Sequence, residues 1–164
     1  MRCPAVSLLL MCLGTVLHVI GLASHQWSVE GDQSQGLWRY CVQDVCRSIP
    51  ERLNTDALLI CRVLALAGMF FSFVSVTLIG LAIHCKTYQY RTIVLTLLST
   101  ASSSVAFFSI VSCTTVWRTI YSVSSSIGFS FIISIIGGTS LIIGVLLFLY
   151  YVKTDKCDDR LLHV

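Results

Sequence analysis

Residues 27–62 read WSVEGDQSQGLWRYCVQDVCRSIPERLNTDALLICR and form the long polar interval of an otherwise apolar chain. Of the 164 residues, 55% are hydrophobic and 12% are charged, whereas a soluble domain carries about 25% charged residues. This deficit of charge indicates a membrane protein. Residues 27–62 then decide the fold, because they must form a small folded cap outside the lipid.

Four stretches of the chain contain no Asp, Glu, Lys or Arg: residues 3–29, 63–85, 92–117 and 119–152. Each is longer than the roughly 20 residues that a helix needs to cross about 30 Å of hydrocarbon. We therefore predict an all-α membrane protein with four transmembrane helices in a single domain, residues 1–164. The predicted helices are about 5–24, 63–83, 92–113 and 129–151, with an extracellular cap at 25–62 and a cytoplasmic tail at 152–164.

The first apolar run also has features of a secretory signal peptide, since Arg2 precedes it and Gly21-Leu22-Ala23 offers small residues for cleavage. Its apolar core is longer than the 7–15 residues usual for a signal peptide, so we expect it to be retained as a helix. His18 lies inside this run, where an ionisable group is costly and a functional role is one interpretation. We favour a neutral imidazole that hydrogen-bonds a neighbouring helix through a group such as a serine hydroxyl.

Charge alone orients the chain weakly. With both termini in the cytoplasm, six Lys and Arg residues lie inside and five outside, a small positive-inside bias. Cys41 and Cys46 give the stronger argument, because two cysteines close together in a polar hairpin form a disulfide readily in an oxidising compartment. We expect the cap to be extracellular and both termini cytoplasmic. The net charge of +3 is not clustered and predicts no nucleic-acid partner.

The cap carries strand patterns. Trp27 and Val29 alternate with polar residues, 31–35 is rich in turn residues, and 37–42 and 45–49 are apolar alternations that predict two further strands. If a two-residue turn joins the latter, Cys41 and Cys46 become cross-strand neighbours about 5.5 Å apart between Cα atoms, within disulfide range. A three-stranded sheet of this size has no core of its own. It must rest on the helix ends, and the two tryptophans supply apolar contact there.

These residues carry a resemblance. Trp27, Gly36-Leu37-Trp38, the pair Cys41 and Cys46, and Arg62 resemble the first-extracellular-loop signature of a four-helix superfamily. This superfamily contains claudins, peripheral myelin protein 22, the epithelial membrane proteins and the lens fibre membrane intrinsic protein. The string Gly-Leu-Trp-Arg-Tyr-Cys is most similar to the lens fibre protein and the small claudin-domain-containing proteins.

The resemblance implies a left-handed four-helix bundle that bears a small extracellular antiparallel sheet. It also implies a disulfide between Cys41 and Cys46, and a position for Trp38 near the outer membrane surface. Arg62 matches the family arginine at the start of the second helix. Its role stays open between a structural bond to the loop and a snorkelling interfacial side chain.

The chain also departs from the family. The loop from His25 to Cys61 has 37 residues, shorter than in claudins, and the second extracellular segment, roughly 114–128, is short as well. Claudins use these parts for contacts between cells, so a paracellular barrier or pore is not implied. The chain contains no Asn-x-Ser/Thr sequon, which favours the lens-type branch.

Small and hydroxylated residues predict how the helices pack. Gly68 with Ser72, Ser134 with Gly138, and Ser140 with Gly144 have the spacing that permits close helix contact. We expect the hydroxyls of four helix residues to satisfy backbone or cross-helix acceptors: Ser99, Ser102, Ser103 and Ser104. Residues 122–126 are interpreted as a solvated linker.

Five residues are candidates for modification or tail recognition. Cys3, Cys85 and Cys157 lie near the cytoplasmic edge, where S-palmitoylation is chemically accessible; otherwise they are free thiols. Leu162 and Val164 fit the C-terminal pattern that adds a strand to a PDZ domain, so a PDZ scaffold is a candidate partner.

Nothing in the sequence supports catalysis, a cofactor or a metal site. The histidines are scattered and no two have metal-ligand spacing, and neither a phosphate loop nor a nucleophile motif is present. We expect a non-enzymatic protein that organises lateral or cell–cell membrane contacts, associating with lipids and with itself or related tetraspan proteins. The expected location is the plasma membrane, at cell junctions, or intracellular vesicles. The alternative is an auxiliary subunit that regulates a channel, receptor or vesicle protein.

Overall fold

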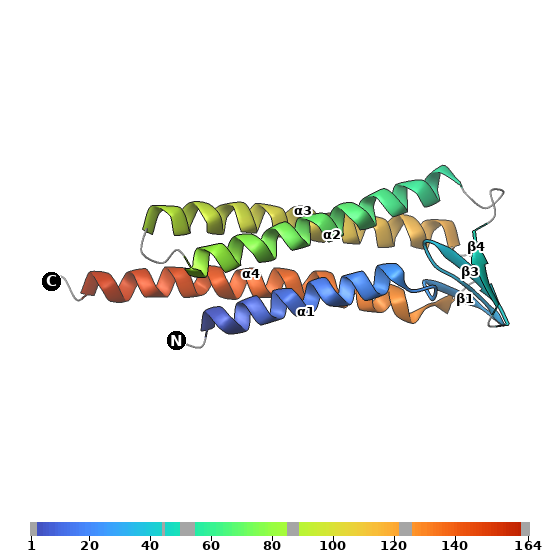
Figure 1. Ribbon diagram of the computed structural model, residues 1–164, viewed down its shortest axis with the longest axis horizontal. Helices are drawn as coiled ribbons and strands as arrows, with labels where there is room; N and C mark the ends of the chain where they lie inside the picture. The colour runs from blue at the N-terminus through green and yellow to red at the C-terminus, as the bar shows by residue number, and fades with distance from the viewer. Residues whose placement is uncertain (1–2, 44, 50–54, 85–88, 122–125, 162–164) are drawn as a thin grey trace.

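The computed structural model describes residues 3–43, 45–49, 55–84, 89–121 and 126–161, with the side chains of 3, 89–91, 120–121 and 155–161 excepted. Four long helices run side by side, a small sheet lies at one end, and both ends of the chain lie toward the other (Figure 1). The helices are α1 (Cys3–Ala23), α2 (Asp56–His84), α3 (Gln89–Tyr121) and α4 (Phe129–Leu161). Each contains a stretch long and apolar enough to cross a membrane.

Three helix boundaries differ from those predicted by seven residues or more. Helix α2 begins at Asp56 rather than 63, because Thr55 caps it: the Leu58 N–H donates to Thr55 Oγ1 at 3.4 Å. Helix α3 continues to Tyr121 instead of 113, and α4 extends to Leu161 through the predicted tail. Charge-free runs mark the apolar part of a helix, whereas its ends depend on backbone hydrogen bonds and caps.

The helices form two close pairs, α1 with α4 and α2 with α3. In the first pair, a methyl group on Gly137 would lie 2.6 Å from the Gly14 carbonyl oxygen, so the two backbones touch. Ser134 faces α1 near Gly21, but Gly138 faces Ile110 of α3. The predicted Ser134–Gly138 pair therefore serves two different interfaces, because residues four apart lie only approximately on one face of a helix.

Serine hydroxyls join the second pair, as predicted. The Ser75 hydroxyl of α2 hydrogen-bonds with those of Ser99 and Ser103, and Ser102 donates to the Phe71 carbonyl at 2.8 Å. Ser104 instead donates to the Thr100 carbonyl of its own helix at 2.9 Å. The buried positions of α2 recur every three or four residues and are mostly small: Leu58, Cys61, Ala65, Gly68, Ser72, Ser75, Ile79 and Ala82.

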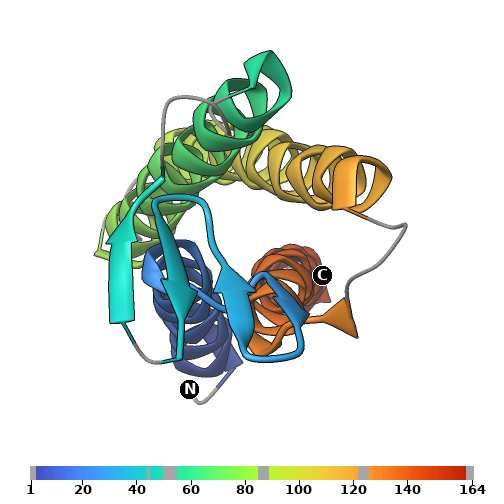
Figure 2. The same cartoon turned by 90° about the vertical axis from the view of Figure 1, so that its right-hand side faces the viewer.

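The sheet has five antiparallel strands and lies across the end of the bundle (Figure 2). The strands are β1 (Ser28–Glu30), β2 (Gln33–Gln35), β3 (Arg39–Val42), β4 (Val45–Ser48) and β5 (Ser126–Ile127). Their order is β4-β3-β2-β1-β5. The outer strand β4 precedes α2 in the chain, and the other outer strand, β5, lies between α3 and α4. The sheet therefore connects residues of the first loop with the segment that leads into the last helix.

Two local predictions in this region were wrong. The polar residues 33–35 form a strand rather than a turn, because the chain already reverses at Gly31, whose φ of +56° suits glycine. Strand β2 then supplies backbone partners to both β1 and β3. Ser126, which lies in the predicted linker, belongs to β5 and pairs with Val29 of β1. Residues 122–125 lie outside the described part of the chain.

Candidate functional site

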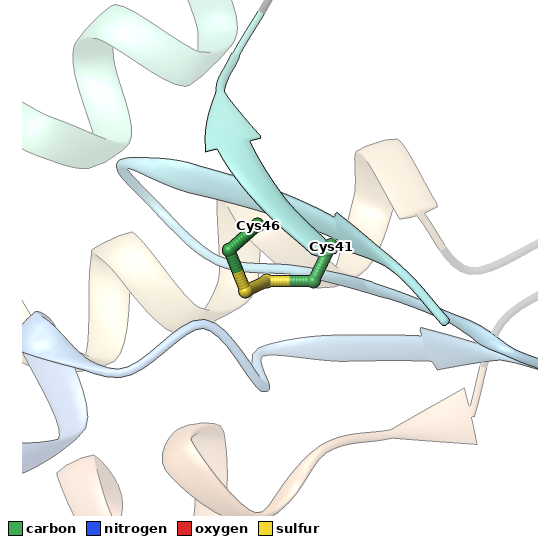
Figure 3. Close-up of a disulfide and its surroundings, with 2 residues drawn as sticks. All are labelled: Cys41 and Cys46. Atoms are coloured by element: carbon green, nitrogen blue, oxygen red, sulfur yellow. A yellow bond between two sulfur atoms is a disulfide. The ribbon is translucent and has the colours of Figure 1, made fainter. Parts of the chain in front are cut away.

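The β3–β4 hairpin is covalently closed. Cys41 and Cys46 form a disulfide with an S–S distance of 2.00 Å (Figure 3). Their Cα atoms are 4.0 Å apart, closer than the predicted value of about 5.5 Å. Val42 and Val45 are the pair of opposed residues nearest to the turn. Cys41 and Cys46 are the second pair from the turn. In a two-residue hairpin this second pair is the closely spaced, non-hydrogen-bonded one.

Two indoles cap the C-terminal end of α1. Trp27 Nε1 donates to the Gly21 carbonyl at 2.7 Å, and Trp38 Nε1 donates to the Leu22 carbonyl at 3.1 Å. Carbonyls in the last turn of a helix have no partner within that helix, and α1 ends at Ala23. The tryptophans were predicted only as apolar contacts with the helix ends. The structure shows that they also donate hydrogen bonds to two carbonyls in the last turn of the first helix.

Trp27 is the centre of the apolar contacts beneath the sheet. Its side chain is 1% exposed and packs edge-on against Trp117 at 5.5 Å and Phe131 at 6.0 Å between ring centroids. The same cluster includes residues from all four helices: Leu22, Leu58, Cys61, Ala65, Cys113, Trp117 and Phe131. The sheet therefore rests on a core that the helices build together.

Gly36 and Leu37 let the β2–β3 loop lie against the segment that follows α1. A methyl group on Gly36 would lie 2.6 Å from both the His25 Cα and the Ser24 carbonyl oxygen, so this position requires glycine. Leu37 follows with a side chain that is 0% exposed and belongs to the core beneath the sheet. The glycine thus brings the loop close enough for leucine to be buried.

Arg62 connects the same loop to α2. Its Nε–H donates to the Leu37 carbonyl at 2.8 Å, and its guanidinium carbon lies 5.2 Å from the Trp38 ring centroid. Of the two roles that the sequence left open, the structure contains the bond to the loop. The motif residues therefore meet at one junction between α1, α2 and the sheet.

The start of α4 is held by the segment that leads into β1. The Ser130 N–H donates to the Gln26 carbonyl and the Gly128 N–H to the Trp27 carbonyl, both at 3.1 Å. A methyl group on Gly128 would collide with the Gln26 carbonyl. Sequence reasoning missed this connection, because residues 26 and 128 are far apart in the chain and neither belongs to a recognisable motif.

His18 links three helices, and its predicted structural role is confirmed. Nδ1 lies 2.7 Å from Ser134 Oγ on α4, and Nε2 lies 3.2 Å from the Ala65 carbonyl on α2. A carbonyl can only accept, so the proton is assigned to Nε2 and the serine hydroxyl donates to Nδ1. This arrangement uses a neutral imidazole and satisfies both of its nitrogen atoms.

The fold also brings together one pair of cysteines and one group of a histidine with the two disulfide cysteines. Cys61 and Cys113 are buried free thiols, and each donates to the other's carbonyl, at 3.7 and 3.3 Å. His25 lies beside the disulfide, with its ring nitrogen and the sulfurs of Cys41 and Cys46 within 4.8 Å of one another. Sequence spacing missed this group, because the histidine precedes the cysteines by 16 residues or more.

The remaining sequence candidates are not placed. Cys85, Leu162 and Val164 lie outside the described residues. Cys3 and Cys157 belong to α1 and α4, but their side chains are outside the description. Palmitoylation and PDZ recognition therefore stay predictions. A comparison of the chain with protein-family models finds no match, and a comparison with curated proteins finds none either.

Proposed function

We propose that this chain is a non-enzymatic four-span plasma-membrane protein whose extracellular sheet organises contacts with other membrane proteins, laterally or between cells. Four helices of sufficient length and apolarity support the membrane assignment. The sheet lies at one end of the bundle and both chain ends lie toward the other (Figure 1), which is compatible with two cytoplasmic termini and an extracellular cap. The disulfide supports placing the cap in an oxidising compartment.

The junction supports membership of the claudin-like superfamily, and with it a left-handed bundle. Trp27 and Trp38 of the cap donate hydrogen bonds to carbonyls of α1, and Arg62 of α2 donates one to the β2–β3 loop of the cap. The resemblance therefore rests on residues that cooperate physically and does not depend on spacing alone.

The observation that carries the contact function is an exposed apolar pair on the β3–β4 hairpin. Val42 and Val45 face each other across the strands and are 37% and 60% exposed. Every residue of β4 is exposed, and among the described strands β4 pairs with β3 alone. An edge strand with apolar side chains favours pairing with another polypeptide. Its partner in this proposal is a second copy or a related tetraspan protein.

The proposal is tested with Val45→Lys, which places a charge on the edge strand without entering the core. Two differently tagged copies are expressed at equal surface levels, and their association is measured by energy transfer between the tags. Ile127→Lys is the matched control, because Ile127 is 45% exposed on β5 at the opposite edge of the sheet.

We expect Val45→Lys to reduce association and Ile127→Lys to leave it unchanged. Equal effects of the two substitutions, or no association of the unmodified chain, would contradict contact with like subunits through the hairpin. Association of the hairpin with a different membrane protein instead would favour the auxiliary-subunit alternative.

A further inference from the structure

The group formed by His25, Cys41 and Cys46 offers more than a structural disulfide. One imidazole nitrogen and two sulfurs lie within 4.8 Å of one another. We propose that, once the Cys41–Cys46 disulfide is reduced, these three side chains bind a Zn²⁺ ion. The cap would then exist in two forms, cross-linked when oxidised and metal-binding when reduced.

The backbone that carries these ligands is held independently of the disulfide. The β3 and β4 strands are paired from Arg39↔Ser48 to Val42↔Val45, and Gly36 packs directly on His25. Trp38 bonds to α1 close to His25 in the chain. The loop that the disulfide closes has only six residues, so the cross-link removes little entropy from the unfolded chain, and the strand pairs and loop contacts hold the cap without it.

The distances suit a tetrahedral ion after a small movement. Zinc–sulfur bonds are about 2.3 Å and zinc–nitrogen bonds about 2.0–2.1 Å, so bound thiolates lie somewhat less than 4 Å apart. The two sulfurs must separate from their bonded distance of 2.00 Å. Cys46 is exposed on the outer strand and can rotate, whereas Cys41 is 4% exposed and stays fixed.

The chemistry proceeds in two balanced steps. A thiol reductant of the glutathione class attacks the sulfur of Cys46, the more exposed of the two residues, the S–S bond breaks, and Cys41 leaves as a thiolate. A second thiol then frees Cys46, so two reductant thiols become one disulfide and the protein gains two cysteine thiols. Zn²⁺ displaces one proton from each thiol to solvent, while His25 binds as a neutral imidazole.

The donor set favours this class of metal. Thiolate and imidazole ligands suit Zn²⁺ over Mg²⁺ or Ca²⁺, which prefer oxygen. Three protein ligands leave the fourth coordination position of a tetrahedral Zn²⁺ ion unfilled. Because Cys46 is exposed, that position is open to water or to a donor atom from another molecule.

Cobalt is a suitable probe, because Co²⁺ bound tetrahedrally by thiolates gives charge-transfer absorption in the near ultraviolet and ligand-field absorption in the visible, and Zn²⁺ displaces it. The full-length protein in detergent is reduced with dithiothreitol, freed of reductant without air, and titrated with Co²⁺. We expect one Co²⁺ per reduced chain and none per oxidised chain. The near-ultraviolet circular dichroism of the tryptophans, which include the buried Trp27, should persist on reduction, and its loss would overturn the proposal.

His25→Ala and His84→Ala form a matched pair, because His84 is an exposed histidine at the C-terminal end of α2. Loss of a supporting outer-shell group typically costs about 10- to 100-fold in metal affinity, so removal of the His25 ligand should weaken binding at least about tenfold. His84→Ala should not change it. Equal effects of the two substitutions, or undiminished binding by a Cys41→Ser, Cys46→Ser chain, would overturn the assignment.

Discussion

Arg62 of α2 donates its Nε–H to the Leu37 carbonyl, 2.8 Å away, and so connects the second helix to the loop that carries Trp38. Lysine cannot reproduce this contact, because its ammonium group lacks the planar geometry that allows one bond to the carbonyl and stacking on the indole. We expect Arg62→Lys to destabilise the cap by about 1–2 kcal/mol. Hydrogen–deuterium exchange of the β2 and β3 amides should therefore become faster.

Arg39→Lys is the control for that experiment. Arg39 is an exposed cation on β3, and surface substitutions usually change stability by no more than about 0.5 kcal/mol. Equal acceleration of exchange in both variants would show that the Arg62 bond has no special role.

Trp27→Phe tests the capping of α1. The phenyl ring retains most of the contact with Trp117 and Phe131, but the Gly21 carbonyl loses its indole donor. An unsatisfied buried acceptor costs about 1–3 kcal/mol, so the thermal midpoint in detergent should fall. Trp38→Phe should have a smaller effect, because Trp38 is 37% exposed and water can replace its bond. The reverse order of the two effects would contradict the capping role of Trp27.

Gly137→Ala tests the contact between α1 and α4. The added methyl group would lie 2.6 Å from the Gly14 oxygen and 2.8 Å from the His18 nitrogen, both backbone atoms that cannot move alone. We expect a loss of about 1–3 kcal/mol in the free energy of unfolding. Gly80→Ala has no atom within 4 Å of the new methyl group and should stabilise its helix by up to about 1 kcal/mol. Equal responses in a denaturation series would refute the close approach.

His18 and Ser134 are suited to a double-mutant cycle. Their side chains lie 2.7 Å apart between α1 and α4. Hydrogen bonds between helices in a membrane average about 0.6 kcal/mol and reach about 1.7 kcal/mol. We expect a coupling energy in the upper part of this range, because His18 is 1% exposed and has little access to a substitute partner. His18→Ala and Ser134→Ala should be non-additive, and strict additivity would exclude the predicted bond.

The sequence predicted the features that depend on local pattern. Charge-free runs located the four helices, and the spacing of Val42 and Val45 predicted the hairpin that joins Cys41 to Cys46. The intramembrane position of His18 predicted a serine-type partner, and Ser134 provides it. In each case few other structures are possible, because a long apolar run must span the membrane as a helix and a polar side chain inside the membrane needs a hydrogen-bond partner.

The sequence did not predict what depends on segments far apart in the chain. The fifth strand pairs Ile127 with Ser28, and His25 joins the cysteines through the path of the β2–β3 loop. Neither contact has a sequence pattern of its own, since backbone pairing is insensitive to side-chain type. The start of α2 and the ends of α3 and α4 were also missed, because polar residues continue a helix as readily as apolar ones.

The placement of the cap outside the cell underlies the proposed function, and epitope accessibility tests it most directly. One tag is inserted between Gly31 and Asp32, an exposed turn where glycine has open space around it, and another follows Val164. In intact cells we predict antibody staining of the turn tag alone, with the C-terminal tag stained only after permeabilisation. Staining of the C-terminal tag in intact cells, with the turn tag protected, would contradict an extracellular cap.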